Sequence, residues 1–168
     1  KIAYGLASVG RGHTTRAIGV AEKLLKAGHE VRFFTRHEAM HLLRKRFGSE
    51  RVVPMLTPRF VYGDHGLETV QTTVANARFL TDRDELAARV ADQIQEWGAD
   101  AVISDFEPLM WSASQQLDLP FISFNSQHFA VACRVRNEIP WWKTWRLLPI
   151  KMLSRFFAPS ANLYVISK

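Results

Sequence analysis

Short apolar runs alternate with amphipathic stretches along most of the 168-residue chain. The apolar runs are rich in β-branched and aromatic residues and therefore predict strands. They are KIAYGLAS (1–8), EVRFFT (30–35), RVVPM (51–55), AVIS (101–104), PFISF (120–124) and NLYVIS (162–167). Between them, apolar residues recur at helical spacing. The predicted helices are 14–28, with Gly28 as the C-cap, 37–47, 82–100 and a helix near 109–117.

Strands separated by helices imply parallel pairing with right-handed crossovers. We therefore predict an α/β fold, a Rossmann-like doubly wound parallel sheet with helices on both faces. Ligands of such sheets bind beyond the carboxyl ends of the strands. These ends lie at 8–13, 35–37, 54–67, 105–108 and 125–128, and the stretch 56–67 has no hydrophobic period, which is typical of a functional loop.

Composition indicates the cellular compartment more clearly than it indicates the activity. The single cysteine, Cys133, cannot form an internal disulfide, and the chain shows no signal-peptide pattern and no apolar run of about 18 residues. We expect a cytoplasmic protein. The formal net charge of +6 suits anionic partners such as nucleotides, nucleic acid or an acidic membrane surface, without choosing among them.

The turn after the first strand, VGRGHTTRA (9–17), could cradle a phosphate, hold a metal or place a base. Gly10, Gly12 and Thr15 nearly spell the dinucleotide-binding pattern G-x-G-x-x-G, but the acid that an NAD site needs is missing at the end of the second strand. Arg36 stands there and could meet a 2′-phosphate. An NADP-dependent enzyme is therefore one alternative.

Two further patterns suggest a metal. HEAMH (37–41) matches the zinc motif H-E-x-x-H, but it directly follows a strand, has basic neighbours and lacks a third ligand. Asp82 and Asp84 could hold a divalent ion, yet they equally suit the start of a helix, with Thr81 as its N-cap. We expect no metal site, and a zinc enzyme remains an alternative.

His13 is a candidate general base. At a helix N-terminus the positive end of the dipole favours the neutral imidazole, which is the form that accepts a proton. Asp105 ends the strand 101–104 at the same rim of the sheet, where it could orient the ring. Because an acceptor hydroxyl is a poor nucleophile, transfer of a sugar to it would benefit from such a pair. Spacing alone also allows both residues to be simple helix caps.

Two long segments resemble known enzymes. GRGHTTRAIGVAEKLLKAGHEVRFFT (10–35) resembles the opening of GT-B glycosyltransferases, both the peptidoglycan-precursor N-acetylglucosaminyltransferases and the UDP-glucuronosyltransferase-like enzymes. VISDFEPLMWSASQQLDLPFISFNSQH (102–128) is similar to an uncharacterised group of bacterial and archaeal glycosyltransferases. The resemblance implies that residues 1–168 are an acceptor-binding N-terminal domain, with a C-terminal donor-binding domain outside this chain.

The resemblance also implies roles for residues and partners. It makes His13 the base of an inverting transfer and Asp105 its partner. The co-substrate would be a UDP-linked nucleotide sugar, with no separate cofactor and an unknown acceptor. Further donor or acceptor contacts are assigned to Gly10, Arg11, Gly12, Glu107, Asn125, Gln127 and His128. The non-enzymatic alternative is a stand-alone module that binds a nucleotide or an anionic lipid.

The segment IPWWKTWRLLPIKMLSRFFAP (139–159) is rich in tryptophan and basic residues. A helical projection places its aromatic and cationic side chains on opposite sides, as in helices that lie in an anionic membrane interface. Such contact through Trp141 to Phe157 would suit a lipid-linked acceptor at the inner face of the membrane. The alternative is a helix that packs its apolar side on the sheet. We expect no nucleic-acid partner, because the cations are not interleaved with aromatic residues on one face.

Overall fold

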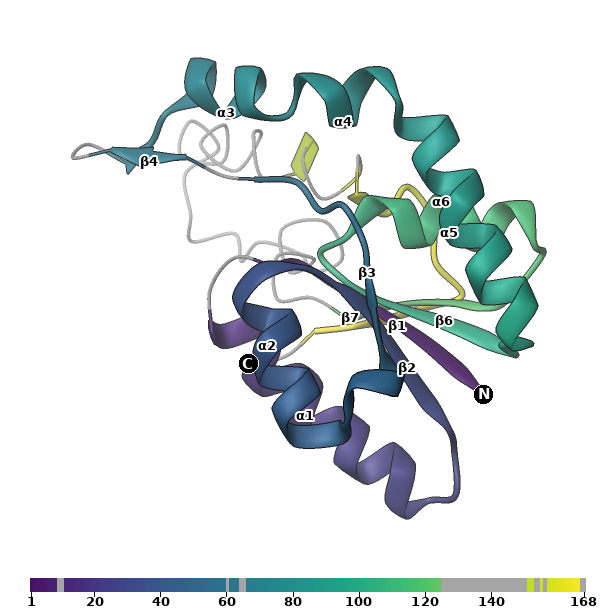
Figure 1. Ribbon diagram of the computed structural model, residues 1–168. Helices are drawn as coiled ribbons and strands as arrows, with labels where there is room; N and C mark the ends of the chain where they lie inside the picture. The colour runs from purple at the N-terminus through teal and green to yellow at the C-terminus, as the bar shows by residue number, and fades with distance from the viewer. Residues whose placement is uncertain are drawn as a thin grey trace, which may run out of the picture.

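The structure is a computed structural model that describes residues 1–8, 11–59, 61–63, 66–124, 151–152, 155 and 157–166. A parallel sheet of six strands forms the centre of this described part, in the order β3-β2-β1-β6-β7-β8 (Figure 1). The strands are β1 (Ile2–Leu6), β2 (Val31–Thr35), β3 (Val52–Pro54), β6 (Ala101–Asp105), β7 (Phe121–Phe124) and β8 (Leu163–Val165). The predicted fold class and all six predicted strands are confirmed.

Helices cover both faces of the sheet (Figure 1). On one face lie α1 (Arg11–Lys26) and α2 (His37–Phe47), and on the other lie α5 (Arg83–Trp97) and α6 (Pro108–Gln116). Because successive strand residues point to opposite faces, Tyr4 and Phe33 pack with α1 and α2, whereas Ala3 and Phe34 pack with α5 and α6. Both faces are therefore buried, which explains why the strands read as nearly continuous apolar runs.

Two glycines have conformational or steric roles in this fold. Gly28 follows α1 with a φ of 87°, a backbone conformation that other residues rarely adopt, and so ends the helix as predicted. At Gly5, in the middle of β1, an added Cβ would lie 2.1 Å from Cγ of Met110. The missing side chain thus lets α6 approach the sheet.

The segment after β3 is more ordered than the predicted loop. It contains the short antiparallel pair β4 (Tyr62–Gly63) and β5 (Gly66–Leu67), then α3 (Thr69–Ala75) and α4 (Ala77–Thr81). Hydrogen bonds of the Asn76 side-chain amide hold the segment. The amide accepts from the Arg59 N–H at 2.7 Å and donates to the Arg59 carbonyl at 2.6 Å. Hydrogen bonds of this kind produce no periodic pattern of apolar residues, so the sequence did not indicate them.

The predicted N-cap Thr81 is wrong. Thr81 is the last residue of α4, and Asp82 occupies the N-cap position of α5. The Thr81 hydroxyl donates to the Asp82 carboxylate at 2.7 Å. The acidic cluster at this point therefore lies at a junction between two helices, a context that a single helical pattern did not indicate.

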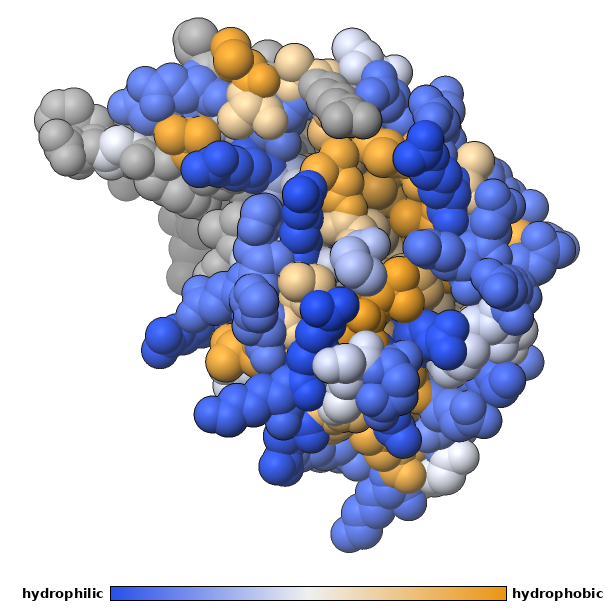
Figure 2. Space-filling model, viewed as in Figure 1, coloured by the Kyte–Doolittle hydropathy of each residue, from blue (hydrophilic) through white to orange (hydrophobic). Residues whose placement is uncertain are grey.

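Figure 2 shows apolar side chains in the middle of the viewed face, over the edge strand β3 and between the hydrophilic surfaces of the flanking helices. Val53 and Leu56 are partly buried here and pack against the core. The strand ends at Pro54, which has no N–H, so this edge is poorly suited to pairing with another strand. Among the described helices, none has the length and apolar character needed to cross a membrane.

Candidate active site

The strand order reverses between β1 and β6. Chain connections lead from β1 through α1 to β2, and from β6 through α6 to β7, on opposite faces of the sheet. The two strands pair in register, with Leu6 opposite Asp105 at their carboxyl ends. A crevice beyond this point is where doubly wound sheets bind their ligands. Residues at the start of α1 and just after β6 therefore meet at the expected position for a site.

His13 and Asp105 lie in contact beyond the carboxyl ends of these two strands, although 92 positions separate them in the sequence. Nδ1 of His13 is 2.8 Å from Oδ1 of Asp105. The Asp105 side chain has no exposed surface, whereas that of His13 is 17% exposed. Since a carboxylate can only accept, the hydrogen is on Nδ1, and Nε2 keeps its lone pair. Within the described residues Nε2 has no hydrogen-bond partner.

Arg16, which the sequence analysis missed, completes the group. Its Nε donates to Asp105 Oδ2 at 2.8 Å and its Nη2 donates to Oδ1 at 2.5 Å. Nη2 also lies 3.0 Å from Nδ1 of His13, a contact without a hydrogen bond because both nitrogens carry hydrogen. Arg16 follows His13 by three positions on α1, so helical spacing places both on one face. That spacing was the available signal.

The turn Ser104 to Pro108 aims Asp105 at His13. The Ser104 hydroxyl donates to the Glu107 carbonyl at 2.7 Å and accepts from the Glu107 N–H at 3.2 Å. Phe106 takes a left-handed backbone, with a φ of 59°. Its ring stacks on that of His13, with centroids 6.1 Å apart and planes 9° apart. The turn thus supplies both a carboxylate and an aromatic surface for the histidine.

Glu107 lies inside the protein as the N-cap of α6. Its Oε2 accepts from the N–H groups of Leu109 at 2.8 Å and Met110 at 3.2 Å, and its Oε1 is buried without a partner. Burial raises the pKa of Glu107 to about 8, although the two N–H donors and the charge of Arg83 act in the opposite direction. The structure thus places this predicted ligand contact as a buried helix cap.

This pKa makes stability depend on pH. Between about pH 5 and pH 8 the folded state holds a proton on Glu107 that the unfolded state has released, so the free energy of unfolding falls as pH rises, by about 3 kcal/mol from this group. Glu107→Gln keeps an acceptor for the cap and places an amide at the unpartnered oxygen. Chemical denaturation at pH 5, 7 and 9 should show this variant gaining stability relative to wild type as pH rises. Parallel curves would contradict the prediction.

The other predicted contact residues are distributed as follows. Arg11 is exposed, and its Nε lies 3.2 Å from Oε1 of Glu38. Gly12 is exposed in the first turn of α1. Lying outside the described residues are Gly10, Asn125, Gln127 and His128.

The geometry bears on the alternatives for this rim. Glu38, the base of the zinc hypothesis, contacts Arg11, and the described residues contain no group of three or more His, Cys, Asp or Glu residues placed to hold a metal ion. The NADP hypothesis needs Arg36 at the end of β2, where this residue is exposed. Its neighbour Thr35 points inward and donates to the Leu6 carbonyl at 3.0 Å.

Of the two alternatives for Trp141 to Phe157, membrane contact or packing on the protein, Phe157 follows the second. Phe157 is buried, and its ring stacks on Phe106 with centroids 4.3 Å apart. In the same segment Met152 is exposed. Residues 141–150 lie outside the described part of the chain.

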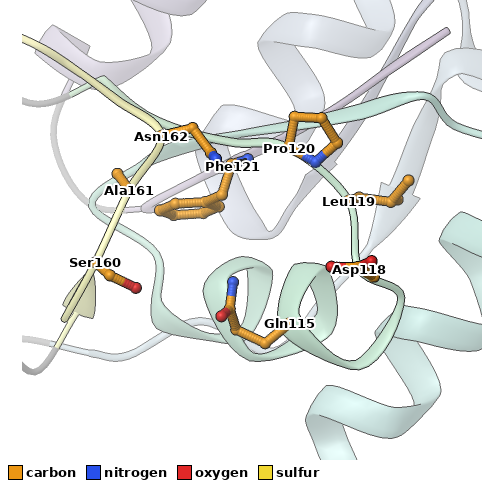
Figure 3. A pocket seen from close by; sticks show the side chains of 8 residues that line it. All are labelled: Gln115, Asp118, Leu119, Pro120, Phe121, Ser160, Ala161 and Asn162. Atoms are coloured by element: carbon orange, nitrogen blue, oxygen red, sulfur yellow. Dashed lines mark hydrogen bonds between the residues drawn. The ribbon is translucent and has the colours of Figure 1, made fainter.

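A cavity of about 360 Å³ lies at the other edge of the sheet (Figure 3). It is formed where β7 and β8 begin, and Asn162 closes one side by accepting from the Phe121 N–H at 2.8 Å. The lining residues are Gln115, Asp118, Leu119, Pro120, Phe121, Ser160, Ala161 and Asn162. Because His13 and Asp105 stand at the carboxyl ends of the strands, this cavity is separate from the candidate active site.

The full sequence, residues 1–168, matches glycosyl transferase family 1. The chain belongs to this family. Three solved structures share its fold. They are MurG of Acinetobacter baumannii (TM-score 0.54, 14% identity, 98% of this chain and 40% of that one), UGT89C1 of Arabidopsis thaliana complexed with quercetin (0.56, 12%, 99% and 43%) and LpCGTa in complex with UDP (0.51, 15%, 99% and 47%).

These structures are GT-B enzymes, so the predicted resemblance to GT-B glycosyltransferases is confirmed. Their low identities make the likeness one of fold. The chain of this glycosyltransferase family member spans about two fifths of the length of MurG and UGT89C1. Among curated proteins no sequence matches it.

Proposed function

We propose that this chain is the acceptor-binding N-terminal domain of a GT-B enzyme that transfers a sugar from a UDP-linked donor to an acceptor hydroxyl with inversion. The observation that carries the proposal is the contact of His13 with the fully buried Asp105 at the switch point of the sheet. Two neighbours in fold add support: LpCGTa is in complex with UDP and UGT89C1 is complexed with quercetin.

In the proposed reaction, Nε2 of His13 removes the proton of the acceptor hydroxyl. The acceptor oxygen forms a bond to the anomeric carbon while the bond from that carbon to the nucleoside diphosphate breaks. Attack from the side opposite the leaving group inverts the anomeric configuration. Asp105 accepts from Nδ1–H throughout and stabilises the imidazolium that forms. General base catalysis of this kind contributes about 10²- to 10⁴-fold.

The start of α1 suits the leaving group. Its first turn has no acidic residue, and the first N–H groups of a helix have no acceptor within the helix. The positive end of a helix dipole stabilises the charge that develops on a departing diphosphate. The proposed transfer therefore needs no bound metal or cofactor, because the helix end supplies electrostatic stabilisation and the donor is a co-substrate.

The direct test is release of free nucleotide by the full-length protein over a panel of nucleotide sugars, with and without candidate acceptors. A productive donor then allows the anomeric configuration of the product to be read by NMR. Inversion is the expected result. Retention would contradict the base mechanism, and binding of a nucleotide or lipid without any transfer would favour a binding module.

Substitution of Gly12 tests whether this glycine contacts a ligand or is required by the fold. It lies in helix α1, and among the described residues no atom other than those of its chain neighbours and of the nearby helix backbone lies within 4 Å of the position that a Cβ would take. Gly12→Ala should therefore fold at least as stably as wild type, with a gain of up to about 1 kcal/mol. If the donor approaches this turn, its KM should rise by about tenfold, or about 1.4 kcal/mol.

Gly19 offers the matched control. It is exposed in the same helix, and a Cβ added there would likewise meet no atom within 4 Å in the described part of the chain, apart from its chain neighbours and the nearby helix backbone. Gly19→Ala should raise stability similarly and leave the steady-state kinetics unchanged. Equal KM values in both variants would remove Gly12 from the binding surface.

A further inference from the structure

Asp105 is a fully buried carboxylate, and a buried charge needs a compensating partner of opposite sign. Two groups beside it could supply the positive charge. Arg16 is permanently cationic, whereas His13 supplies a charge only when it is protonated. A protonated His13 has no lone pair and cannot act as a base. The identity of the compensating group therefore decides whether the proposed mechanism can start.

We propose that Arg16 is a positioning residue that neutralises Asp105 and so leaves His13 uncharged and ready to accept the acceptor proton. This inference rests on the proposed function and deepens it. Two hydrogen bonds of the guanidinium go to the two oxygens of one carboxylate, a geometry that fixes the carboxylate plane. Oδ1 of Asp105 is thereby held toward Nδ1 of His13.

The position of Arg16 acts on His13 directly as well. Nη2 of Arg16 lies 3.0 Å from Nδ1 of His13, so a second positive charge on the ring would face the first. The guanidinium also lies against an aromatic ring, 5.6 Å from the centroid of Phe124 on β7. These contacts keep the cation beside the histidine rather than in solvent, and its side chain is only 18% exposed.

The remaining titratable group that faces the cluster in the described residues is Tyr4 on β1. Burial and the negative charge of Asp105 raise the pKa of its hydroxyl far above the ordinary value, while Arg16 lowers it. Tyr4 is thus neutral at physiological pH. The charge balance of the cluster is set by Asp105, Arg16 and His13 alone among these groups.

Two variants of the full-length protein separate charge from geometry. Arg16→Met removes the cation, so Asp105 should draw a proton onto His13. We expect the acid limb of the kcat profile to move up by about one to two pH units, with activity lost at pH 7 and regained near pH 9. Arg16→Lys keeps the charge but loses the two-pronged geometry. It should lower kcat severalfold without moving the limb.

A readout that does not depend on activity completes the test. In protein labelled with ¹⁵N-histidine, the His13 signal is identified by its loss in His13→Gln. At pH 7 we expect a neutral ring with Nδ1–H in wild type and in Arg16→Lys, and an imidazolium in Arg16→Met. The double variant Arg16→Met/Asp105→Asn should return the ring to neutral, because the uncompensated carboxylate is gone.

The outcomes distinguish the two proposals. A neutral His13 and an unmoved pH profile in Arg16→Met would overturn the role of Arg16. An imidazolium in Arg16→Met together with full transfer activity in His13→Gln would support the charge compensation and refute His13 as the base. If Arg16→Met does not fold, Arg16→Lys and the double variant still test the proposal. Arg16→Lys retains the cation and the double variant lacks the carboxylate, so His13 should be neutral in both. An imidazolium in either variant would overturn the proposal.

Discussion

Replacing His13 with alanine in the full-length protein is expected to lower kcat for sugar transfer by at least about a hundredfold. The change removes the one nitrogen of the cluster that has a lone pair and faces away from Asp105. KM for donor and acceptor should change little, because the base acts on the transition state rather than on ground-state binding. Initial rates of nucleotide release at saturating donor and acceptor measure the effect.

The fold should survive this change. Asp105 loses the hydrogen bond from His13 but keeps both bonds from Arg16, so the expected loss in the free energy of unfolding is about 1 kcal/mol. His41→Ala provides a matched control, since His41 is an exposed histidine on α2 away from the cluster. Its kinetics should equal those of wild type. Equal turnover in His13→Ala would exclude His13 as the base.

The sequence predicted the centre of the sheet because β1, β2 and β6 share one environment, buried on both faces. In a parallel sheet covered on both faces each strand must be apolar throughout, and each crossover helix must carry an apolar stripe. Those patterns located β1 and β6 and the side chains that follow them. Placing His13 and Asp105 at one rim then required only the rule that parallel strands end at the same edge.

The pattern could not reveal how the cluster is held. Arg16 is a charged residue on an amphipathic helix, and such residues usually face solvent. Its spacing of three positions from His13 places the two residues on one helix face, but this spacing does not indicate a buried acid as the partner. Phe106 takes a left-handed backbone conformation, which the residue type does not predict. This conformation aims Asp105 and places an aromatic ring against His13. Both features arise from tertiary contacts between α1 and the turn after β6.

At Glu107 the sequence suggested a functional role, but the structure shows a structural one. Its neighbours match a glycosyltransferase turn, which suggested contact with a ligand. The residue directly before Pro108 is also the N-cap position of a helix with proline at its first turn, and the carboxyl group caps that helix from inside the protein. A residue within a functional motif can thus serve the shape of the motif rather than its chemistry.

Asp105 variants should produce the largest loss of stability together with a loss of activity. Asp105→Ala leaves the guanidinium of Arg16 without its carboxylate in a largely buried position, so we expect the free energy of unfolding to fall by about 3 kcal/mol. Asp105→Asn keeps an oxygen for Arg16 and should cost less. Chemical denaturation of the full-length variants compares the two.

Turnover should nevertheless fall by about 10²- to 10⁴-fold in Asp105→Asn as well, because a neutral amide neither fixes the Nδ1–H tautomer of His13 nor stabilises the imidazolium. The stability loss in Asp105→Ala should come mainly from the stranded cation. The double variant Asp105→Ala/Arg16→Met is therefore expected to recover much of that loss while remaining inactive, and a double-mutant cycle measures the coupling. Additive losses would mean that the ion pair contributes little to the fold, and the buried carboxylate would then need another source of compensation.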